Sequence, residues 1–407
     1  MKPLVRRTLL AMLYRGCCRQ AAAPPGPLLD CKRVVVIRFD EIGDLILTLP
    51  FLRELRQFMP HARIALVVRP ALVNLVQLCP HVDVVIPFAP KFGFRPGRLI
   101  KLLALRKAVF SALGGVPELG ILPRFDADFS RGLIALLAAG AQWRIAFSES
   151  ATPEKAVADI DTDRFLTQAI KPPPGELHEL NRNLSLLEAL GAAVQSDRLE
   201  LYLSGEDRNK AAQILSPHSH IRVWVGLCAG ASIPRKRWPV DRFTQVAKHV
   251  MENIPDCGVV VIGGPDDRNA GVFIQQHIPG TVVNVAGELT LRETAAVLAN
   301  CALYIGNDTG PMHLAAAVGV PVVAIFADPR PACAEESGGN PPPARFDPCG
   351  VPYRIVTPPA GETSDQSAMK SRCGFIDRVM VNDVMDAVAE VLSRSPQNAK
   401  LASSRNV

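Results

Sequence analysis

Apolar runs long enough for buried strands alternate with amphipathic stretches over most of the chain. Residues 34–39 (VVVIRF) form the first of these runs, and Arg38 is its one polar position. A nearly continuous apolar run is typical of a strand that is covered on both faces, as in a parallel sheet. The alternation of such runs with helical periodicity therefore predicts an α/β fold with parallel sheets.

Five strands and three helices are predicted before residue 200. The strands are residues 34–39, 62–68, 82–88, 125–129 and 144–147, and the helices are residues 44–58, 132–138 and the leucine-rich stretch 177–190. The leucines of the last helix are three or four positions apart, which places them on one face, and Gly191 follows its end. We interpret it as the last helix of a first domain.

The same alternation begins again at Ile221. Its strands are residues 221–227, 258–264, 282–285, 302–306 and 320–326, a helix follows each of the first four, and a final helix covers residues 375–392. Residues 327–374 are rich in Pro, Gly and Ser, and we expect them to form a long loop. Ligands of open parallel sheets bind beyond the carboxyl ends of the strands, so the loops at those ends are the candidate sites.

The length and composition fit a globular protein of two domains. The chain of 407 residues is longer than a single hydrophobic core usually serves, so two domains are expected. Its composition, 48% apolar and 21% charged residues, excludes a disordered, collagen-like or coiled-coil chain. The expected parts are a basic leader at 1–31 that could be disordered, an N-terminal domain at 32–205, a C-terminal domain at 220–395 and a tail at 396–407.

The net charge of +6 is concentrated at one end of the chain. Residues 1–33 hold seven basic side chains and one acidic side chain, whereas the remainder is balanced. A nucleic-acid partner is therefore not expected, and no recognition motif for one is present. The apolar residues 8–14 are too few for an export signal before Arg15 and Arg19, so an uncleaved leader or an early start codon is favoured.

Neither a metal site nor a membrane span is predicted. The ten cysteines lack the C-x-x-C and Cys/His spacings of metal and haem sites, which fits a reducing compartment. No apolar run approaches the roughly 20 residues of a spanning helix. Asp126 and Asp128 form a D-x-D pair, as in metal-dependent sugar transferases, but their flanks alternate like a strand, so we do not predict metal binding there.

Three carboxylates follow the first strand, at Asp40, Glu41 and Asp44. Gly43 can take a backbone angle that is closed to other residues, and Asp44 could cap the helix that begins there. Three carboxylates this close repel one another unless a positive group binds among them. One of them is therefore a candidate general base.

Residues that suit a phosphate follow the strand 221–227. Small residues up to Ser232 let a ligand approach the backbone, and Lys236 with Arg235 or Arg237 supplies positive charge for phosphate oxygens. A solvated basic loop is the alternative.

A second phosphate-binding pattern follows the strand 302–306. Residues 307–310 (NDTG) come directly after this strand, and a helix begins at Pro311. The free N–H groups of that helix start form an anion site, for which a diphosphate is the natural occupant. An N-cap at Asp308 and simple packing of His313 are the alternatives. Neither G-x-x-x-x-G-K-[ST] nor an opening G-x-G-x-x-G is present, which argues against P-loop hydrolysis and nicotinamide chemistry.

These clusters together resemble glycosyltransferase family 9, the heptosyltransferases. The resemblance rests on IRFDEIGDLILTLPFL, GASIPRKRWP, IGGPDD and GNDTGPMHLAAAVGVPVVAIF, in that order, and covers about residues 32–328. It implies the α/β GT-B architecture of two facing Rossmann-like domains with parallel sheets, the first on the acceptor side and the second for the nucleotide-diphosphate sugar. It also implies inverting transfer of a heptose from ADP-heptose to lipopolysaccharide core, with no metal or other cofactor.

The resemblance implies a role for each matching residue. Asp44 would be the base that deprotonates the acceptor hydroxyl, Lys236 would contact the donor phosphates, and Asp267 would bind the ribose. The rest of the donor-binding set would be Asp308, Thr309 and Gly310, which hold the diphosphate and the sugar, together with Ser232 and His313.

A basic stretch without acids lies between the predicted strands 82–88 and 125–129. Its bases are Lys91, Arg95, Arg98, Lys101, Arg106 and Lys107, with phenylalanines and leucines among them. Such a segment suits an anionic membrane surface or a phosphorylated, lipid-linked acceptor, and a solvated helix face is the alternative. We expect it to dock the acceptor, with the protein in the cytoplasm at the inner face of the inner membrane.

The region after Phe326 departs from the family. The short loop expected there is replaced by FADPRPACAEESGGNPPP. A transferase of the same fold that uses another sugar nucleotide, or a protein or capsule acceptor, is therefore an alternative. A non-catalytic, membrane-associated protein that binds nucleotide sugars is another.

Overall fold

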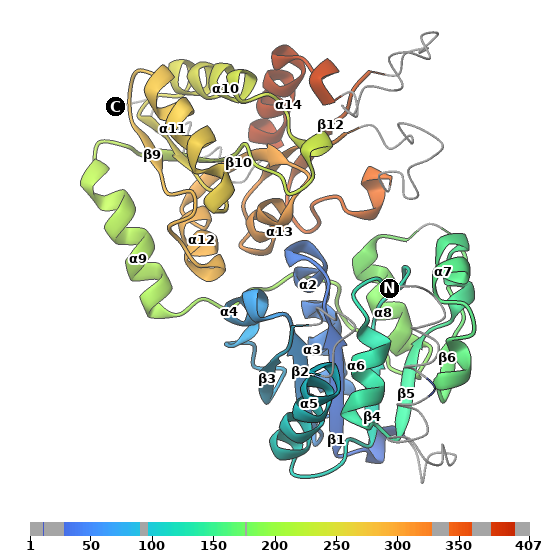
Figure 1. The fold of residues 1–407 in the computed structure, drawn as a ribbon. Helices are drawn as coiled ribbons and strands as arrows, with labels where there is room; N and C mark the ends of the chain where they lie inside the picture. The colour runs from blue at the N-terminus through green and yellow to red at the C-terminus, as the bar shows by residue number, and fades with distance from the viewer. Residues whose placement is uncertain are drawn as a thin grey trace. The chain divides into compact units, whose positions relative to one another are not determined.

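The computed structural model describes residues 28–89, 97–175, 177–327, 342–359 and 376–394, together with Ala11. The chain divides into two compact units, Met1–Asp197 and Arg198–Val407. Within the described residues, each unit contains one six-stranded parallel sheet with helices packed on it (Figure 1). The prediction of two Rossmann-like α/β domains with parallel sheets is therefore confirmed.

The first unit has the strand order β3-β2-β1-β4-β5-β6. Its strands are β1 (Arg33–Arg38), β2 (Arg63–Val68), β3 (Val84–Pro87), β4 (Leu119–Leu122), β5 (Trp143–Phe147) and β6 (Gln168–Ile170). Its helices are α2 (Ile42–Ile46), α3 (Leu49–Phe58), α4 (Val73–Val76), α5 (Gly97–Leu113), α6 (Gly132–Ala139), α7 (Pro153–Ala158) and α8 (Glu179–Glu188).

The second unit has the strand order β12-β11-β10-β7-β8-β9. Its strands are β7 (Val223–Cys228), β8 (Cys257–Val261), β9 (Val282–Asn284), β10 (Cys301–Asn307), β11 (Val322–Ile325) and β12 (Tyr353–Val356). Its helices are α9 (Gly205–Leu215), α10 (Val240–Asn253), α11 (Arg268–His277), α12 (Leu291–Leu298), α13 (Gly310–Ala317) and α14 (Val381–Arg394).

Both sheets place the first strand of the unit beside the fourth. In the first unit β1 pairs with β4, and in the second β7 pairs with β10. The connections run in opposite directions on the two sides of such a pair, which leaves a crevice at the carboxyl ends of its strands. The loops that follow these four strands are therefore where each unit can hold a ligand.

Most predicted helices and strands are present, but several places differ. Helices α4, α7 and α9 were not predicted. The predicted strand 125–129 is wrong, because the strand is β4 and those residues form a turn. The predicted helix 44–58 is divided into α2 and α3. Within the expected loop 327–374, residues 353–356 form β12 beside β11. The sequence also gave no indication of β6.

No described helix combines the length and the apolar character that crossing a bilayer requires.

Gly120 lets β4 lie directly against α6. A Cβ atom at this position would lie 2.5 Å from Cδ1 of Leu136 and 2.6 Å from Cβ of Ala141. Because α6 is buried along its whole length, its side chains have little room to move away. This close approach therefore requires a residue without a side chain at position 120.

We predict that Gly120→Ala destabilises the protein. Overpacking of this kind costs about 1–3 kcal/mol, and about 1 kcal/mol corresponds to about 2–4 °C in a domain of this size. Thermal denaturation measures the effect. Gly205→Ala is the matched control, because no atom lies within 4 Å of a Cβ there. An equal melting temperature for both variants would contradict the close packing of β4 on α6.

Candidate active site

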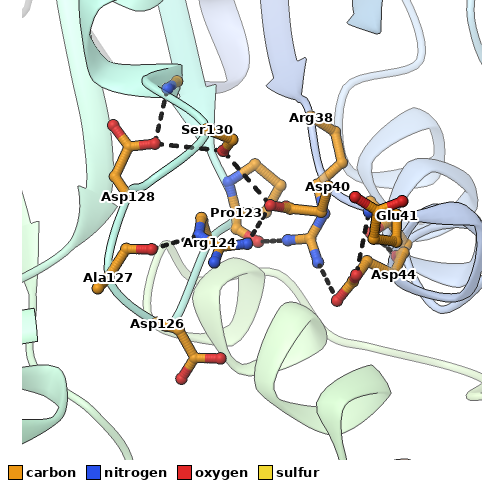
Figure 2. A network of polar contacts seen from close by, with 12 residues as sticks. Arg38, Asp40, Glu41, Asp44, Pro123, Arg124, Asp126, Ala127, Asp128 and Ser130 are labelled. Carbon is orange, nitrogen blue, oxygen red and sulfur yellow. Dashed lines mark hydrogen bonds and ion pairs between the residues drawn. The ribbon is translucent and has the colours of Figure 1, made fainter. Parts of the chain in front are cut away.

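Charged side chains gather at the carboxyl ends of β1 and β4 (Figure 2). Arg38 ends β1, Asp40 follows it, and Arg124 lies two residues after β4. Arg38 is 1% exposed and Asp40 is 6% exposed. Buried charges are tolerated only when they are paired, and Arg38 and Asp40 are both paired.

Asp40 is held by two arginines. Nε of Arg38 lies 2.9 Å from its Oδ2, and Nη1 of Arg124 pairs with its Oδ1. The hydroxyl of Ser130 also donates to Oδ1, at 3.4 Å. With both oxygens engaged and the side chain buried, Asp40 is an anchor for the arginines and is poorly placed to accept a proton from a ligand.

Asp44 is more open than Asp40. It is the third residue of α2, and its side chain is 22% exposed. Its Oδ2 accepts a hydrogen bond of 3.2 Å from the backbone N–H of Glu41, and its Oδ1 lies 3.5 Å from Nη2 of Arg38. The hydroxyl of Thr48 donates to its carbonyl at 2.6 Å, where α2 ends. The carboxylate is thus fixed at one end of α2 while keeping access to solvent.

The surroundings of Asp44 favour its protonated form. Its pKa is raised to about 7, first because burial disfavours the carboxylate and then because Asp40 repels it. Glu179 also raises the pKa, whereas the guanidinium groups of Arg38 and Arg124 lower it. A carboxyl group that titrates near neutral pH can accept a proton there and release it again.

The prediction of Asp44 as an N-cap is wrong by three residues. The N-cap of α2 is Glu41, and Asp44 accepts the N–H of that residue from within the first turn. The positive groups that the three carboxylates require come from the chain itself. Arg69 pairs with Glu41 at 2.8 Å, and the arginines of β1 and of the loop after β4 serve the other two.

Helix α8, near the C-terminal end of the first unit, supplies two further partners for Arg38. Nη2 of Arg38 donates to Oε1 of Glu179 at 3.5 Å, and Nη1 donates to Oδ1 of Asn183 at 3.4 Å. The amide of Asn183 donates in turn to the carbonyl of Leu47 at 3.1 Å, beyond the end of α2. Glu179 is 3% exposed and Asn183 is fully buried. These contacts tie α8 to both Arg38 and α2.

The turn after β4 is held rigidly. Asp128 accepts the N–H groups of Gly132 and Leu133, at 2.7 and 2.9 Å, and so caps α6. Lys155 of α7 donates to the carbonyl of Asp126 at 3.0 Å. The D-x-D pair therefore has a structural role through Asp128, and no group of three possible ligands is placed for a metal ion among the described residues.

A buried asparagine organises the corresponding crevice of the second unit. Asn307, at the end of β10, is fully buried. Its Oδ1 accepts the N–H of Trp238 at 3.1 Å, and its Nδ2 donates to the carbonyls of Ala229 and Gly230 at 3.0 and 3.2 Å. One amide thus holds both ends of the loop that carries Lys236.

Lys236 lies against the start of α13. Its Nζ forms an ion pair with Oδ2 of Asp308, and the two side chains are 17% and 13% exposed. The N-cap of α13 is Thr309, so the alternative of an N-cap at Asp308 is wrong. Gly310 is the first residue of α13, and His313 is buried within the helix. The structure brings these predicted donor residues together.

Asp267 and Ser232 lie beside the same loop. Oδ2 of Asp267 accepts the N–H of Gly264 at 2.9 Å. A Cβ atom at Gly230 would lie 2.0 Å from Oδ1 of Asp267, so only glycine allows this approach. Ser232 is exposed two residues further along. The predicted donor-binding residues therefore all lie around the β7–β10 crevice of the second unit.

The predicted acceptor and membrane residues lie on or before α5. Lys101 and Lys107 are exposed on this helix. Arg106 instead lies against the end of α6, since a Cβ atom at Gly140 would come within 2.8 Å of its Nη1. Lys91 and Arg95, and the side chain of Arg98, are outside what the structure describes.

Sequence reasoning missed the residues that position these groups. They are Arg38, Arg124, Glu179, Asn183 and Asn307. A signal existed for Arg38, because a charged residue inside an otherwise apolar strand must find partners when it is buried. For Glu179 and Asn183 the leucine periodicity of α8 gave no such signal.

Comparison with known proteins identifies a family match. Residues 139–337 match glycosyltransferase family 9 (heptosyltransferase). Lipopolysaccharide core heptosyltransferase OpsX of Haemophilus influenzae is 23% identical over 302 residues, 74% of this chain and 80% of that protein. Lipopolysaccharide heptosyltransferase 2 of Escherichia coli is 32% identical over 115 residues, 27% of this chain and 32% of that protein.

Solved structures share the fold. A family 9 glycosyl transferase from Veillonella parvula superposes with a TM-score of 0.73 at 23% identity, covering 89% of this chain and 98% of that one. The Escherichia coli ADP-heptose lipopolysaccharide heptosyltransferase II gives 0.64 at 20% identity, covering 89% and 99%. The predicted GT-B fold class is confirmed by these neighbours.

We predict that Asp44→Asn stabilises the protein in a pH-dependent way. The pKa of Asp44 is about 7 in the folded chain and about 4 in an unfolded one, so wild-type stability is lost as pH rises between these values. An asparagine cannot ionise and avoids this loss. Its melting temperature should match the wild type near pH 4 and exceed it by several degrees at pH 8.

Thermal denaturation across this pH range measures the difference. Glu188→Gln, an exposed change on α8, is the control and should show no such trend. A constant difference between Asp44→Asn and wild type at every pH would contradict the raised pKa.

Proposed function

We propose that this chain is a glycosyltransferase of family 9 that transfers a heptose from ADP-heptose to lipopolysaccharide core with inversion and without a metal. One observation carries the proposal: the two matching crevices differ in chemistry, with a proton-accepting carboxyl in the first unit and a basic loop beside a helix start in the second. The relatives, a lipopolysaccharide core heptosyltransferase and an ADP-heptose lipopolysaccharide heptosyltransferase, support the choice of sugar and acceptor.

Asp44 is the general base in this proposal. The acceptor hydroxyl gives its proton to the Asp44 carboxylate as its oxygen attacks the anomeric carbon of the donor. The new C–O bond forms while the bond from that carbon to the diphosphate breaks, so ADP leaves with the electron pair. Attack from the face opposite the leaving group inverts the configuration, and a base whose pKa lies near the working pH suits this step.

The second unit stabilises the leaving diphosphate. Lys236 turns from Asp308 toward the phosphate oxygens, and the N–H of Gly310, at the positive end of α13, donates to them as well. In this proposal Lys236 and the start of α13 take the place that a metal has in other sugar transferases. Asp308, once released, binds sugar hydroxyls, and Asp267 binds the ribose.

Helix α5 contacts an anionic membrane surface in this proposal. Apolar side chains are exposed along it, at Leu99, Ile100, Leu103 and Phe110, next to Lys101 and Lys107. Exposed leucine and phenylalanine beside lysine is the composition of segments that lie at a lipid interface. The protein would then act at the inner face of the inner membrane, where a lipid-linked acceptor is within reach.

We predict ADP release from ADP-heptose in the presence of heptose-deficient core lipid. Asp44→Asn should lower kcat by about 10²–10⁴-fold because it removes the base. Lys236→Ala should mainly weaken donor binding and leaving-group stabilisation, so it should raise KM and lower kcat together. Lys248→Ala, which removes an exposed positive charge on α10 outside this loop, is the control. Full activity of Asp44→Asn would remove this residue from the mechanism, and no transfer by the wild type would refute the donor or acceptor.

We predict that the protein sediments with vesicles that contain anionic lipid. Exchange of Lys101 and Lys107 for glutamine should reduce the bound fraction severalfold, since each basic residue near the surface contributes about 1 kcal/mol. Leu103→Ser tests the apolar part. Lys248→Gln, an exposed change on α10, is the control. Equal sedimentation of all variants would argue against a role for α5.

A further inference from the structure

The guanidinium of Arg38 is divided among three carboxylates. Its Nε lies 2.9 Å from Asp40, whereas its Nη2 lies 3.5 Å from both Asp44 and Glu179. A close arginine–carboxylate pair has two parallel contacts of about 2.7–2.9 Å. Asp44 therefore has only a single long contact with the nearest positive charge, although that charge is almost fully buried beside it.

The position of Glu179 explains this division. It lies at the start of α8, 141 residues from Arg38 in sequence, and is 3% exposed. Asn183, one turn further along α8, accepts from Nη1 of Arg38, and the carbonyl of Pro123 accepts from the same Nη1. All three nitrogens of the guanidinium are thus engaged, and it cannot swing toward Asp44 without leaving other partners.

We propose that Glu179 is a positioning residue for Asp44: it holds Arg38 away from a close pair with the base and adds a negative charge that keeps the base able to take a proton. The inference rests on the proposed role of Asp44. A closely paired Asp44 would be a stable carboxylate, and such a group is a weak proton acceptor.

The charges around Asp44 agree with this role. Arg38 and Asp40 face it from the end of β1, Arg124 from the loop after β4, and Glu179 from α8. Glu41, the N-cap of α2, is paired with Arg69. Among these groups Asp40 and Glu179 raise the pKa of Asp44, and Glu179 is the one that comes from a distant helix and is itself buried. It therefore acts through Arg38 and through the field at Asp44.

Glu179→Gln tests the proposal through the pH profile of kcat/KM. Removing the negative charge lowers the pKa of Asp44. The acid limb of the profile, which is the rise of kcat/KM with pH as Asp44 loses its proton, therefore moves to lower pH. A weaker base also lowers the plateau above neutral pH. The ratio of variant to wild-type kcat/KM should consequently be about 3- to 10-fold higher at pH 6 than at pH 8. Glutamine keeps the shape and can still accept from Arg38, and a melting curve checks that the variant is folded.

Two further variants define the cause. Glu188→Gln removes the same charge from the exposed face of α8 and should leave the limb in place. Asn183→Asp adds a negative charge on the other side of Arg38 and should move the limb to higher pH, which provides an independent test if Glu179→Gln does not fold. The proposal is overturned if a folded Glu179→Gln has the wild-type limb, or if Asn183→Asp moves the limb downward or not at all.

Failure of this inference and failure of the proposed function give different results. If Asp44→Asn keeps full activity, the assignment of the base is wrong whatever Glu179→Gln does. If Asp44→Asn is inactive while Glu179→Gln keeps the wild-type limb, the base stands and Glu179 is only structural.

Discussion

A buried positive charge at the end of β1 is the constraint on which the first unit depends. Arg38 has lost nearly all contact with water, so its guanidinium must be paired by protein groups. Those partners come from the loop after β1, from the segment after β4 and from α8. Leaving such a charge without its partners costs about 3–5 kcal/mol, so the same contacts that place the carboxylates also hold these three segments together.

In the second unit a neutral residue holds together the segments at the end of the corresponding strand pair. Asn307 occupies the end of β10, and its amide satisfies one N–H and two carbonyls of the loop after β7. No charge is fully buried at that junction among the described side chains, and the ion pair of Lys236 with Asp308 retains some exposure. One crevice therefore tunes a proton equilibrium, whereas the other keeps positive charge near solvent, where a phosphate can reach it.

Local patterns explain what the sequence could predict. Both sheets were visible because a strand buried on two faces has a continuous apolar run, and the amphipathic faces of α8 and α14 are local as well. The clusters that contain Asp44, Lys236 and Asp308 were found because each lies in the segment between a strand and the next long helix. Their roles in catalysis and donor binding stay predictions.

The misses have physical causes of the same kind. Alternation over residues 125–129 arises from a turn in which Asp128 faces inward to cap α6, and not from a strand. Residues 353–356 are too few to stand out in a Pro-rich segment, and only pairing with β11 makes them a strand. The leucines of α8 indicate which side of the helix is buried, but they do not indicate that Glu179 is buried as well. Glu179 is paired with Arg38, which is distant in sequence, so no local pattern could reveal it.

The ion pair between Lys236 and Asp308 has a consequence for turnover. In the proposed reaction the lysine must leave the aspartate whenever a nucleotide occupies the crevice, and it returns when the crevice empties. The aspartate is therefore an internal competitor for the same ammonium group. In that reaction the released Asp308 would bind the sugar of the donor but has no such partner in ADP, so the competition would weaken the hold on ADP more than on the donor and would favour release of the spent nucleotide.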